Sequence, residues 1–584
     1  MNVVGVSAFY HDSACAVVVD GRLVAAAQEE RFTRRRHDRD APLYAYRSCL
    51  ELAGIGPADV DLLAYYENPR RKLSRQLWLA LADDADPGRM PRLDATQPER
   101  ELRERLGFDG PFVTVDHHEA HAANAFYCSG FEEAALFTAD AVGEWTTTSY
   151  GVGDGDGIQI TGEVPFPHSL GLLYSAVTAF LGFSVNGDEY KVMGLAAYGR
   201  PRYYDRLAEL VTTGPDGQFR LDAGLVLPRL GGPLYPDSLA ARLGVTPRLP
   251  GGEIAETHRD LASSVQLLLE DLLGQALEYL HSAHPSENLC YAGGVALNCV
   301  ANSRLRRRGP FRHWFVPPAP GDAGSAVGAA LLAHHRADGD RHVRRLADAR
   351  LGAAPGRGAL TAVLTEADVA YEDYTGRESD LLERVTDLLV QGAVLGWHQG
   401  RMEFGPRALG GRSILADPRD PAMRDRINQR VKKREEFRPF APAVVAERAA
   451  DLFELDVDSP FMLETAAVRP GVTLPAVSHV DGSARIQTVA RDVAPRFHAL
   501  LTCFGRRTGM PVLLNTSFNV AGEPIVNDAL DALSCFVRAG LDALVVDDIL
   551  VLRAAVPPAW RDHLSRAADR HAPRVHNDSY SFFL

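Results

Sequence analysis

The sequence has few cysteines and no paired ones, which argues against two kinds of architecture. Its seven cysteines are scattered over 584 residues, and none of them forms a C-x-x-C pair. A zinc ribbon needs such pairs, and a disulfide framework needs an even set in an oxidising compartment. The pattern therefore favours reduced, buried thiols in a cytoplasmic protein.

Long apolar runs and a secretory leader are also missing. The opening, MNVVGVSAFYHDSACAVVVDG, has no basic segment before its apolar residues, and Asp12 and Asp20 interrupt the run. No other stretch has the ~20 apolar residues that a membrane-spanning helix requires. We therefore expect neither a signal peptide nor a membrane partner.

An excess of positive charge is missing as well. The formal net charge is -14, whereas nucleic-acid binding needs a clustered excess of Lys and Arg. We therefore expect no nucleic-acid partner, although local basic clusters can still bind small anions. With 46% hydrophobic and 24% charged residues, the composition is that of a globular protein. The length exceeds what one hydrophobic core supports and predicts at least two domains.

The first part of the chain has the strand, turn and helix pattern of an α/β fold. Apolar runs predict strands at 2–7, 14–19 and 23–27, and the pair Asp20-Gly21 predicts a hairpin turn between the last two. The first strand ends at the polar run His11-Asp12-Ser13, where side chains can face a phosphate. Apolar residues at helical spacing then predict a long amphipathic helix over Thr257 to His281.

A compositional change predicts the domain boundary. The segment from Asp338 to about Glu378 is rich in Arg, Ala, Gly, Asp and Pro and has weak periodicity. We expect a first domain over residues 1–350 and a second over residues 351–584. The second domain is predicted to mix strands, at 393–397 and 511–514, with helices, one of them near 421–431.

A histidine cluster, DHHEAH, is the most specific small motif. On a helix, His117 and His121 are four residues apart and share a face, so both can bind one metal ion. His118 and His121 are also neighbours, so the spacing alone leaves the pair open. An H-E-x-x-H protease motif is excluded, because His118-Glu119 is followed by the next histidine one residue too early. Histidines without a ligand remain an alternative.

Two glycine-containing segments could approach a nucleotide. Gly293-Gly294 follows a hydrophobic strand in CYAGGVALN, with Asn298 available for hydrogen bonds. Asp322, in PAPGDAGSAVGAA, could supply a third metal ligand, although a helix N-cap is the commoner role for such an aspartate. The segment NGDEYKVMG adds Glu189 and Lys191, which could equally belong to an ordinary surface loop.

The second half concentrates arginines among glycines and aromatic residues. GRMEFGPRALGGR supplies Arg401, Arg407 and Arg412, and NQRVKKREEFRPFAP supplies a further basic run. Guanidinium groups bind phosphate oxygens in pairs, so an anion pocket is the physical interpretation. A solvated basic face is the alternative. Further polar candidates follow in HVDGSARIQTV and LLNTSFNVAGEPI: Arg485, Asn515, Thr516, Ser517 and Asn519.

Taken together, these segments resemble the NodU/CmcH carbamoyltransferase family of nodulation-factor and antibiotic O-carbamoyltransferases. The resemblance runs from Val3 to about Asp547. Its carriers are SAFYHDSACAVVVDG, AAAQEERFTRRRHD, DHHEAHAANAFY, SLGLLYSAVTAFLGF, EYKVMGLA, GGVALNCVAN, GRMEFGPRALG, REEFRPFAP, HVDGSARIQTV and LLNTSFNVAGEPIV. Several long motifs in the family's order make a chance match implausible.

The resemblance implies a fold and a reaction. It implies an α/β chain with an N-terminal domain of the actin-like ATPase (ASKHA) superfamily and an α+β C-terminal domain similar to YrdC. It also implies that carbamoyl phosphate and ATP give a carbamoyl adenylate, which carbamoylates a hydroxyl of a small natural product. A divalent metal ion, Fe²⁺ or alternatively Mg²⁺, is expected to help hold the nucleotide, and the protein could form a homodimer.

The same resemblance assigns roles to individual residues. His11 would be the catalytic base that takes the proton of the acceptor hydroxyl. The metal ligands would be His117, His121 and Asp322, and the nucleotide contacts would be Glu189, Lys191, Gly293, Gly294 and Asn298. The carbamoyl phosphate site would comprise Arg407, Lys432, Arg438, Arg485, Asn515 and Ser517.

Some residues depart from the family pattern, and other functions compete. His398 stands where an aromatic residue is expected, Gly411 where Asn is expected and Ala197 where Pro is usual. Three other functions compete. A tRNA threonylcarbamoyl enzyme is disfavoured by the net acidity, and a hydrogenase maturation factor is disfavoured by the missing C-x-x-C pairs. The third is a nucleotide-binding regulator. Acceptor specificity is expected in the loops at 65–97 and 214–252.

Overall fold

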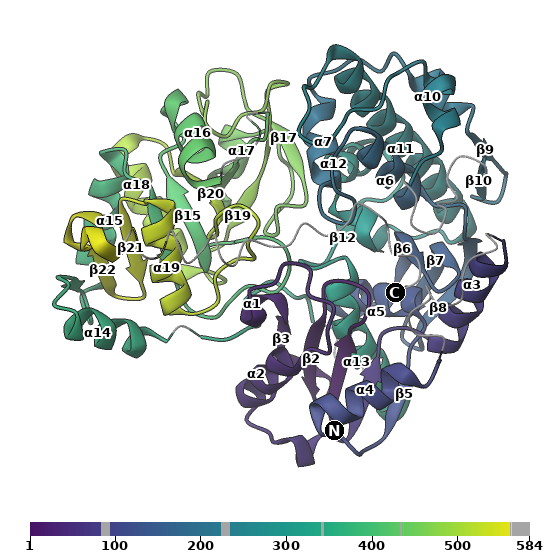
Figure 1. Ribbon diagram of the computed structural model, residues 1–584, viewed down its shortest axis with the longest axis horizontal. Coiled ribbons are helices and arrows are strands. Elements are labelled where there is room, and N and C mark those ends of the chain that lie inside the picture. The colour runs from purple at the N-terminus through teal and green to yellow at the C-terminus, as the bar shows by residue number, and fades with distance from the viewer. Residues whose placement is uncertain are drawn as a thin grey trace. The chain divides into compact units, whose positions relative to one another are not determined.

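The computed structural model describes residues 1–82, 94–222, 234–339, 344–354, 356–432, 435, 437–560, 562 and 564. The chain divides into two compact units (Figure 1). The first comprises Met1–Glu29 and Arg39–Leu346, and the second comprises Glu30–Asp38 and the described residues from Ala347 onwards. The segment Glu30–Asp38 therefore belongs to the second unit. The expected first domain, residues 1–350, would have included this segment.

The first sheet of the first unit has the order β3-β2-β1-β4-β5. Strands β1 (Asn2–Ser7), β2 (Ala14–Val19) and β3 (Arg22–Gln28) are antiparallel, which confirms the predicted hairpin. Asp20 and Gly21 form its turn with φ values of 46° and 73°, as a tight two-residue turn requires. Strands β4 (Leu62–Tyr65) and β5 (Phe112–Thr114) then continue the sheet parallel to β1.

The second sheet repeats this topology. Its order is β12-β11-β6-β7-β8, so that three antiparallel strands are again followed by two parallel ones. The strands are β6 (Ala134–Gly143), β7 (Thr146–Asp154), β8 (Gly157–Pro165), β11 (Asn288–Ala292) and β12 (His313–Phe315). Two sheets with one strand order agree with the actin-like ATPase fold that the family resemblance implied.

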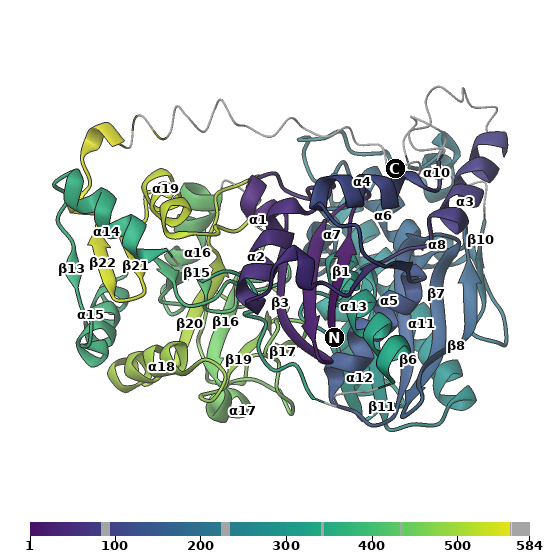
Figure 2. The same cartoon turned by 90° about the horizontal axis from the view of Figure 1, so that it is seen from below.

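Two helices, α5 (His117–Ser129) and α13 (Asp322–Asp338), pack closely against each other (Figure 2). Helix α13 lies against the first sheet, and helix α5 lies against the second. Small residues allow the contact: a Cβ atom on Gly5 of β1 would overlap the Ala326 carbonyl, and one on Gly328 would overlap the Ala120 carbonyl. Such close approach fixes the first turns of both helices relative to the strand ends.

Four further helices group together in the first unit (Figure 1). They are α6 (Leu170–Phe180), α7 (Glu189–Ala196), α11 (Glu256–Ala283) and α12 (Cys299–Arg308). Helix α11 confirms the predicted amphipathic helix and buries Leu261, Val265 and Leu273. Within the described part of the chain, α11 and every other helix lack an apolar stretch of the length that crosses a bilayer.

The second unit is built on one mixed sheet of order β13-β22-β21-β14-β15-β20-β16-β19. The predicted strands near 393–397 and 511–514 correspond to β14 (Leu395–His398) and β20 (Val512–Ser517). The other strands are β13 (Glu372–Asp373), β15 (Arg412–Ala416), β16 (Ala441–Val445), β19 (Gln487–Val489), β21 (Ala543–Val546) and β22 (Ile549–Leu552). Both units therefore combine helices and strands, and the whole chain belongs to the mixed α/β class.

Helices cover both faces of this sheet. One core packs α15 (Glu378–Val390) and α18 (Pro495–Thr508) against it. The other core contains residues of α14 (Arg357–Glu366), α16 (Pro421–Ile427) and α19 (Ala529–Ala539). Helix α14 lies inside the segment whose weak periodicity predicted a boundary, so part of that segment is regular structure.

The segment Glu30–Asp38 is tied into the second unit by arginines. Arg34 donates hydrogen bonds to the carbonyls of Ile525 (2.6 Å) and Pro524 (2.9 Å). Arg31 is fully buried and donates to the Gly405 carbonyl at 2.6 Å. Buried guanidinium groups that bind main-chain carbonyls fix the backbone in place, and the segment therefore shapes the loop around Gly405.

Candidate functional site

Strand ends of the first unit bring the candidate residues together. Parallel strands β1, β4 and β5 end at one edge of the first sheet, and the loop with His11 and the first turn of α5 follow β1 and β5. In the second sheet, Asp140 lies near the end of β6, and Gly293 follows the parallel strand β11. Ligand sites in α/β folds form at such carboxyl ends.

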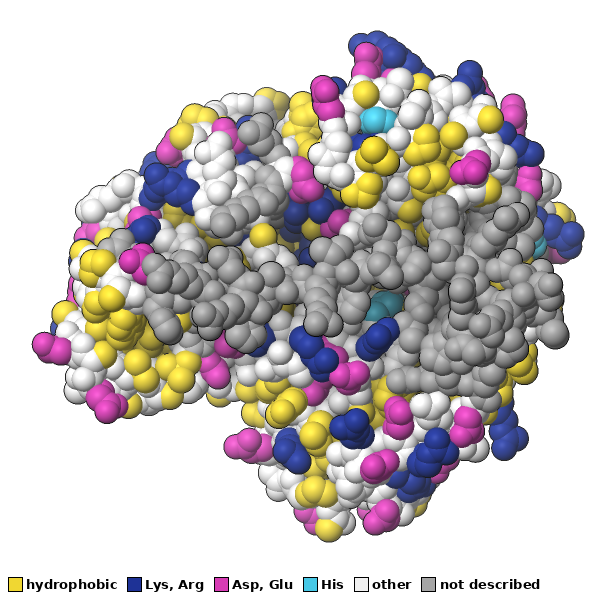
Figure 3. All heavy atoms as spheres, viewed as in Figure 1, with side chains coloured by type: hydrophobic (Ala, Val, Ile, Leu, Met, Phe, Trp, Pro, Cys, Tyr) yellow, Lys and Arg dark blue, Asp and Glu magenta, His cyan; other side chains and the backbone are white. Residues whose placement is uncertain are grey.

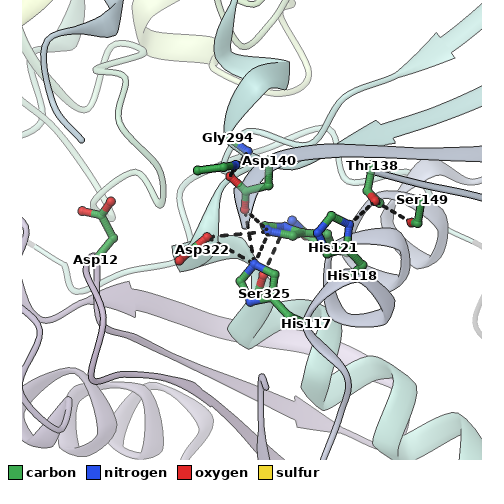
Figure 4. Close-up of polar contacts among 12 residues, drawn as sticks. Asp12, His117, His118, His121, Thr138, Asp140, Ser149, Gly294, Asp322 and Ser325 are labelled. Atoms are coloured by element: carbon green, nitrogen blue, oxygen red, sulfur yellow. Dashed lines mark hydrogen bonds and ion pairs between the residues drawn. The ribbon is translucent and has the colours of Figure 1, made fainter. Parts of the chain in front are cut away.

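Four buried side chains converge at this position (Figure 4). The Nε2 atoms of His117 and His121 lie 3.0 Å apart, and they lie 3.2 and 3.0 Å from Asp140 Oδ2. Asp322 Oδ1 lies 3.6 Å from both nitrogens. One ligand atom from each of the four residues can be chosen so that all lie within 4.8 Å of one another.

The donor set fits a divalent cation. In the cluster, two imidazole nitrogens face each other and two carboxylates. A positive charge between them is needed to make this arrangement favourable. Without a cation, only protonation of the histidines can supply that charge. Burial would lower the pKa of His121, but Asp140 and Asp322 outweigh it and raise the pKa to about 9. Burial would raise the pKa of Asp140, but the two histidines hold it well below its usual range. Imidazole and carboxylate together suit a metal such as Fe²⁺ better than Mg²⁺, which prefers oxygen ligands.

The structure separates the two histidine pairs that the spacing left open. His118 turns away from the cluster, and its Nδ1 lies 2.6 Å from the Thr138 hydroxyl, which in turn contacts Ser149 at 2.5 Å (Figure 4). Burial and the neighbouring histidines hold the pKa of His118 well below its ordinary value. His117 and His121 therefore form the convergent pair, and His118 is a neutral buried residue.

Asp140 was missed by the sequence interpretation. It lies in FTADAVG, an apolar strand that reaches a glycine, so an aspartate near a strand end was the available signal. Its second oxygen, Oδ1, accepts hydrogen bonds from the Ala141 N–H (2.8 Å) and the Gly294 N–H (3.3 Å). The carboxylate thus links the histidine cluster to the glycine turn.

Asp322 does not take the N-cap role that the sequence favoured on local grounds. Gly321 occupies the N-cap position, and Asp322 is the first residue of α13. Its buried Oδ2 atom has no hydrogen-bond partner among the described residues and lies 3.6 Å from His11 Nε2. The side chain is therefore turned into the cluster, where a ligand or a cation can satisfy it.

His11 lies beside this cluster and is oriented by Asp12. Its Nδ1 lies 2.9 Å from Asp12 Oδ2. Burial alone would lower the pKa of His11, but Asp322 and Asp12 outweigh that effect and raise the pKa to about 9. Among protein groups alone, these two carboxylates therefore favour the protonated form of the His11 ring. A cation bound to Asp322 would oppose the protonated form by charge repulsion.

The glycine turn at Gly293-Gly294 packs tightly against the backbone of β6. Gly293 adopts φ = 98°, and a Cβ there would overlap the Ala139 carbonyl. Asn298 caps α12 by accepting from the Ala301 N–H (3.0 Å), and its amide donates to Gln266 Oε1 (2.9 Å). The turn is therefore held rigidly beside the histidine cluster.

The other two predicted nucleotide contacts lie on α7. Glu189 accepts hydrogen bonds from the Ser175 hydroxyl (2.8 Å) and the Asn186 N–H (2.9 Å). Lys191 forms an ion pair with Asp188 at 3.0 Å. They lie at the start of a helix rather than in the charged loop that was the alternative. Their role towards a nucleotide stays a prediction.

In the second unit, Lys432 and Ser517 lie together. The Lys432 ammonium faces four acceptors: the Ser517 carbonyl (2.6 Å) and hydroxyl (3.3 Å), and the Asn519 carbonyl (3.0 Å) and side-chain oxygen (2.7 Å). This buried cation fixes the loop that follows β20. The adjacent Lys433 and Arg434 of the basic run lie outside the described residues.

Asn515 connects strand β20 to the loop that carries Arg407. Its Nδ2 donates to the Ala408 carbonyl (3.1 Å) and to Gln487 Oε1 (2.7 Å), and Gln487 Nε2 donates to the Leu409 carbonyl (2.8 Å). Arg485 lies on β18 (Ser483–Arg485), two residues before Gln487. Arg438 pairs with Glu435 at 3.5 Å.

Arg412 differs from the anion-binding residue that the sequence suggested. It is fully buried and donates to the carbonyls of Asn527 (2.9 Å), Gly400 (3.0 Å) and Gln399 (3.2 Å). Arg401 likewise donates to the Gly352 carbonyl at 3.0 Å. Both guanidinium groups bind the protein's own backbone. They therefore hold the loop in its conformation rather than bind a phosphate.

The comparisons with known proteins point to one family. Residues 2–85 and 100–331 match the family model described as Carbamoyltransferase N-terminus, and residues 386–553 match Carbamoyltransferase C-terminus. A Synechocystis protein called sll1178, described as uncharacterized, is 42% identical over 96% of this chain and 98% of its own. Nodulation protein NolNO of Sinorhizobium fredii is 38% identical over 94% and 80%. The 3'-hydroxymethylcephem-O-carbamoyltransferase of Amycolatopsis lactamdurans is 30% identical over 93% and 98%.

Among solved structures, HypF of T. kodakarensis is similar to 59% of this chain and 50% of its own, with 16% identity and a TM-score of 0.32.

Proposed function

This chain belongs to the carbamoyltransferase family, and from that premise we propose that it is an ATP-dependent O-carbamoyltransferase. Carbamoyl phosphate is the donor, a carbamoyl adenylate is the intermediate, and the acceptor is a hydroxyl of a small natural product, for example an antibiotic precursor. The observation that carries the proposal is the convergence of His117, His121, Asp140 and Asp322 beside the Gly293-Gly294 turn.

The cluster supports ATP use because it combines cation ligands with a backbone that a phosphate can approach. His117, His121, Asp140 and Asp322 would hold Fe²⁺ or, less in keeping with the imidazoles, Mg²⁺. When bound, such a metal supplies positive charge for the nucleotide phosphates. Gly293, Gly294 and Asn298 would lie along the nucleotide, with Glu189 and Lys191 towards the nucleoside.

The second unit would bind the donor in a YrdC-like site. Carbamoyl phosphate is an anion, so Arg407, Arg438 and Arg485 would bind its phosphate oxygens through charge-assisted hydrogen bonds. Lys432 would hold the Ser517 loop in position, because four oxygens of that loop already face its ammonium group. Asn515 would fix the Arg407 loop through the Ala408 carbonyl.

His11 would take the proton of the acceptor hydroxyl. It lies at the edge of the cluster, and Asp12 orients its ring, as a general base requires. The acceptor would enter near 65–97 and 214–252. Helix α3 (Pro69–Ala82) forms part of the first segment, while residues 83–93 and 223–233 lie outside the described residues.

The charge distribution supports a small-molecule acceptor over tRNA. On the face shown in Figure 3, the described Lys and Arg side chains are interspersed with Asp and Glu rather than gathered in a stripe. Nucleic-acid binding would require clustered positive charge. We also propose a cytoplasmic location, in keeping with seven buried, unbridged cysteines.

A donor and acceptor screen tests the proposal. The purified protein would be incubated with ATP, Fe²⁺, carbamoyl phosphate and a panel of hydroxylated metabolites, and products would be analysed by mass spectrometry. We expect a product that has gained one carbamoyl group only when ATP and carbamoyl phosphate are both present. A parallel reaction with tRNA, threonine and bicarbonate addresses the rival function, and modified adenosine there would reverse the assignment.

A further inference from the structure

The two histidines of the cluster are held by different means. His121 has a partner on its second ring nitrogen, since Nδ1 lies 3.1 Å from the Ser325 hydroxyl. His117 Nδ1 is buried and has no hydrogen-bond partner among the described residues. Metal-binding histidines usually receive their orientation through that second nitrogen. The orientation of His117 must therefore come from elsewhere.

The turn between β6 and β7 supplies contacts to His117. Glu144 Oε1 accepts the His117 main-chain N–H at 3.0 Å, and Oε2 lies 3.3 Å from the same nitrogen. The preceding residue, Gly143, lies so close to the imidazole that a Cβ atom there would overlap the ring. On another side, the ring of Tyr66 meets the imidazole edge-on, with centroids 5.2 Å apart.

Glu144 takes over the role that the residue before the helix usually has. Asp116 is the N-cap residue of α5, but its side chain makes no capping hydrogen bond. It pairs instead with Arg71 and accepts from the Asn68 amide at 3.2 Å. A helix start normally satisfies its first N–H groups through the N-cap side chain. Here a carboxylate from a distant hairpin satisfies the first one.

The same carboxylate also holds the start of α3. The Asn68 main-chain N–H donates to Glu144 Oε1 at 2.6 Å, and Asn68 Oδ1 accepts from the Arg70 N–H at 3.2 Å. The next residue of the turn, Trp145, donates its indole N–H to the Ser74 hydroxyl at 2.7 Å. Glu144 is 2% exposed, so water does not compete for these bonds.

We propose that Glu144 is a positioning residue for the metal site: its carboxylate fixes the first turn of α5 and thereby the direction of the His117 imidazole. This inference rests on the proposed metal site. It explains why His117 can do without a partner on Nδ1. It also explains why Gly143 precedes Glu144, since only a residue without Cβ lets the turn approach the ring.

Titration with Co²⁺ alone, followed by its visible absorption, tests the proposal. Glu144→Ala is expected to weaken Co²⁺ binding by about 10- to 100-fold, the effect typical of residues that orient metal ligands. Glu144→Gln keeps an oxygen for both N–H groups, so its affinity should stay close to wild type. Glu119→Ala is the matched control, because Glu119 lies on the same helix and pairs with Arg336.

The outcomes separate this inference from the proposed function. A folded Glu144→Ala protein with wild-type Co²⁺ affinity would overturn the positioning role, as would a Glu144→Gln protein as weak as the alanine variant. If Glu144→Ala does not fold, the Gly143→Ala variant tests the proposal instead. Its Cβ atom should displace the His117 ring and weaken Co²⁺ binding at least tenfold. Unchanged binding would contradict the proposal. Wild-type protein that binds no Co²⁺ removes the metal site and this inference together. Co²⁺ binding without carbamoyl transfer removes only the proposed reaction.

Discussion

The two units present their polar residues in opposite ways. In the first unit, the histidine nitrogens of the cluster lie 3.0–3.6 Å from each other and from the aspartate oxygens. Asp322 Oδ2 has no hydrogen-bond partner among the described residues. In the second unit, Lys432 and Arg412 are surrounded by oxygens of the protein itself. Groups that remain unsatisfied need a ligand, whereas groups that are already satisfied fix the backbone. At least two residues of the basic motifs in the second half therefore fix the backbone, and the donor-binding role that we propose falls to others.

Removal of the histidine pair should have the largest effect on this contrast. The double variant His117→Ala/His121→Ala removes both imidazole partners of Asp140 and leaves Asp322 only His11 as a neighbouring cation. We expect metal binding and ATP-dependent transfer to fall below detection, which metal analysis and product assays would measure. Carbamoyl phosphate binding by the second unit should persist in calorimetry, and its loss would show that the two sites are not separate.

His11→Ala should affect only the last step. Removal of a general base typically lowers the rate by about 10²- to 10⁴-fold. We expect transfer to the acceptor to fall by that amount while adenylate formation, followed as pyrophosphate release, continues. Equal transfer rates in the variant and the wild type would remove His11 from the mechanism.

Arg485→Ala tests the second unit without touching the first. Loss of a charge-assisted contact to a bound anion costs roughly 2–5 kcal/mol, so carbamoyl phosphate affinity should fall about 30-fold or more. ATP and metal binding should stay unchanged in the same protein. Phosphate release at the wild-type rate would exclude Arg485 from the donor site, and Arg485→Lys shows whether charge alone suffices.

Gly411→Asn should have the smallest effect, and that effect is on stability. The substitution introduces the residue that the family pattern predicts at this position. A Cβ atom at Gly411 would lie 2.9 Å from the buried Glu403 carboxylate, which accepts the Gly411 N–H. We expect the free energy of unfolding to fall by about 1–3 kcal/mol through overpacking. Gly358→Asn is the control, since a Cβ there meets nothing within 4 Å. Equal stability of the two variants would mean that this loop accommodates asparagine.

Local patterns predicted the elements well and the site only in part. The first hairpin, α11 and β20 follow from apolar periodicity and turn residues, because these depend on neighbours in sequence. The spacing placed His117 and His121 on one helix face but left His118 as an alternative, and only the family resemblance selected the pair. Asp140 and Glu144 were missed because their roles depend on contacts across 19 and 27 residues. The segment Glu30–Asp38 contacts backbone that is more distant still, and Arg412 binds the Asn527 carbonyl 115 residues away. No local pattern reveals such contacts.

The central claim is that one chain activates carbamate with ATP and then transfers it. The most direct measurement is the product stoichiometry with labelled carbamoyl phosphate, ATP and an accepted hydroxyl compound. The account predicts one phosphate, one pyrophosphate and one AMP for each carbamoylated product. Transfer without ATP, or release of ADP in place of AMP and pyrophosphate, would contradict it.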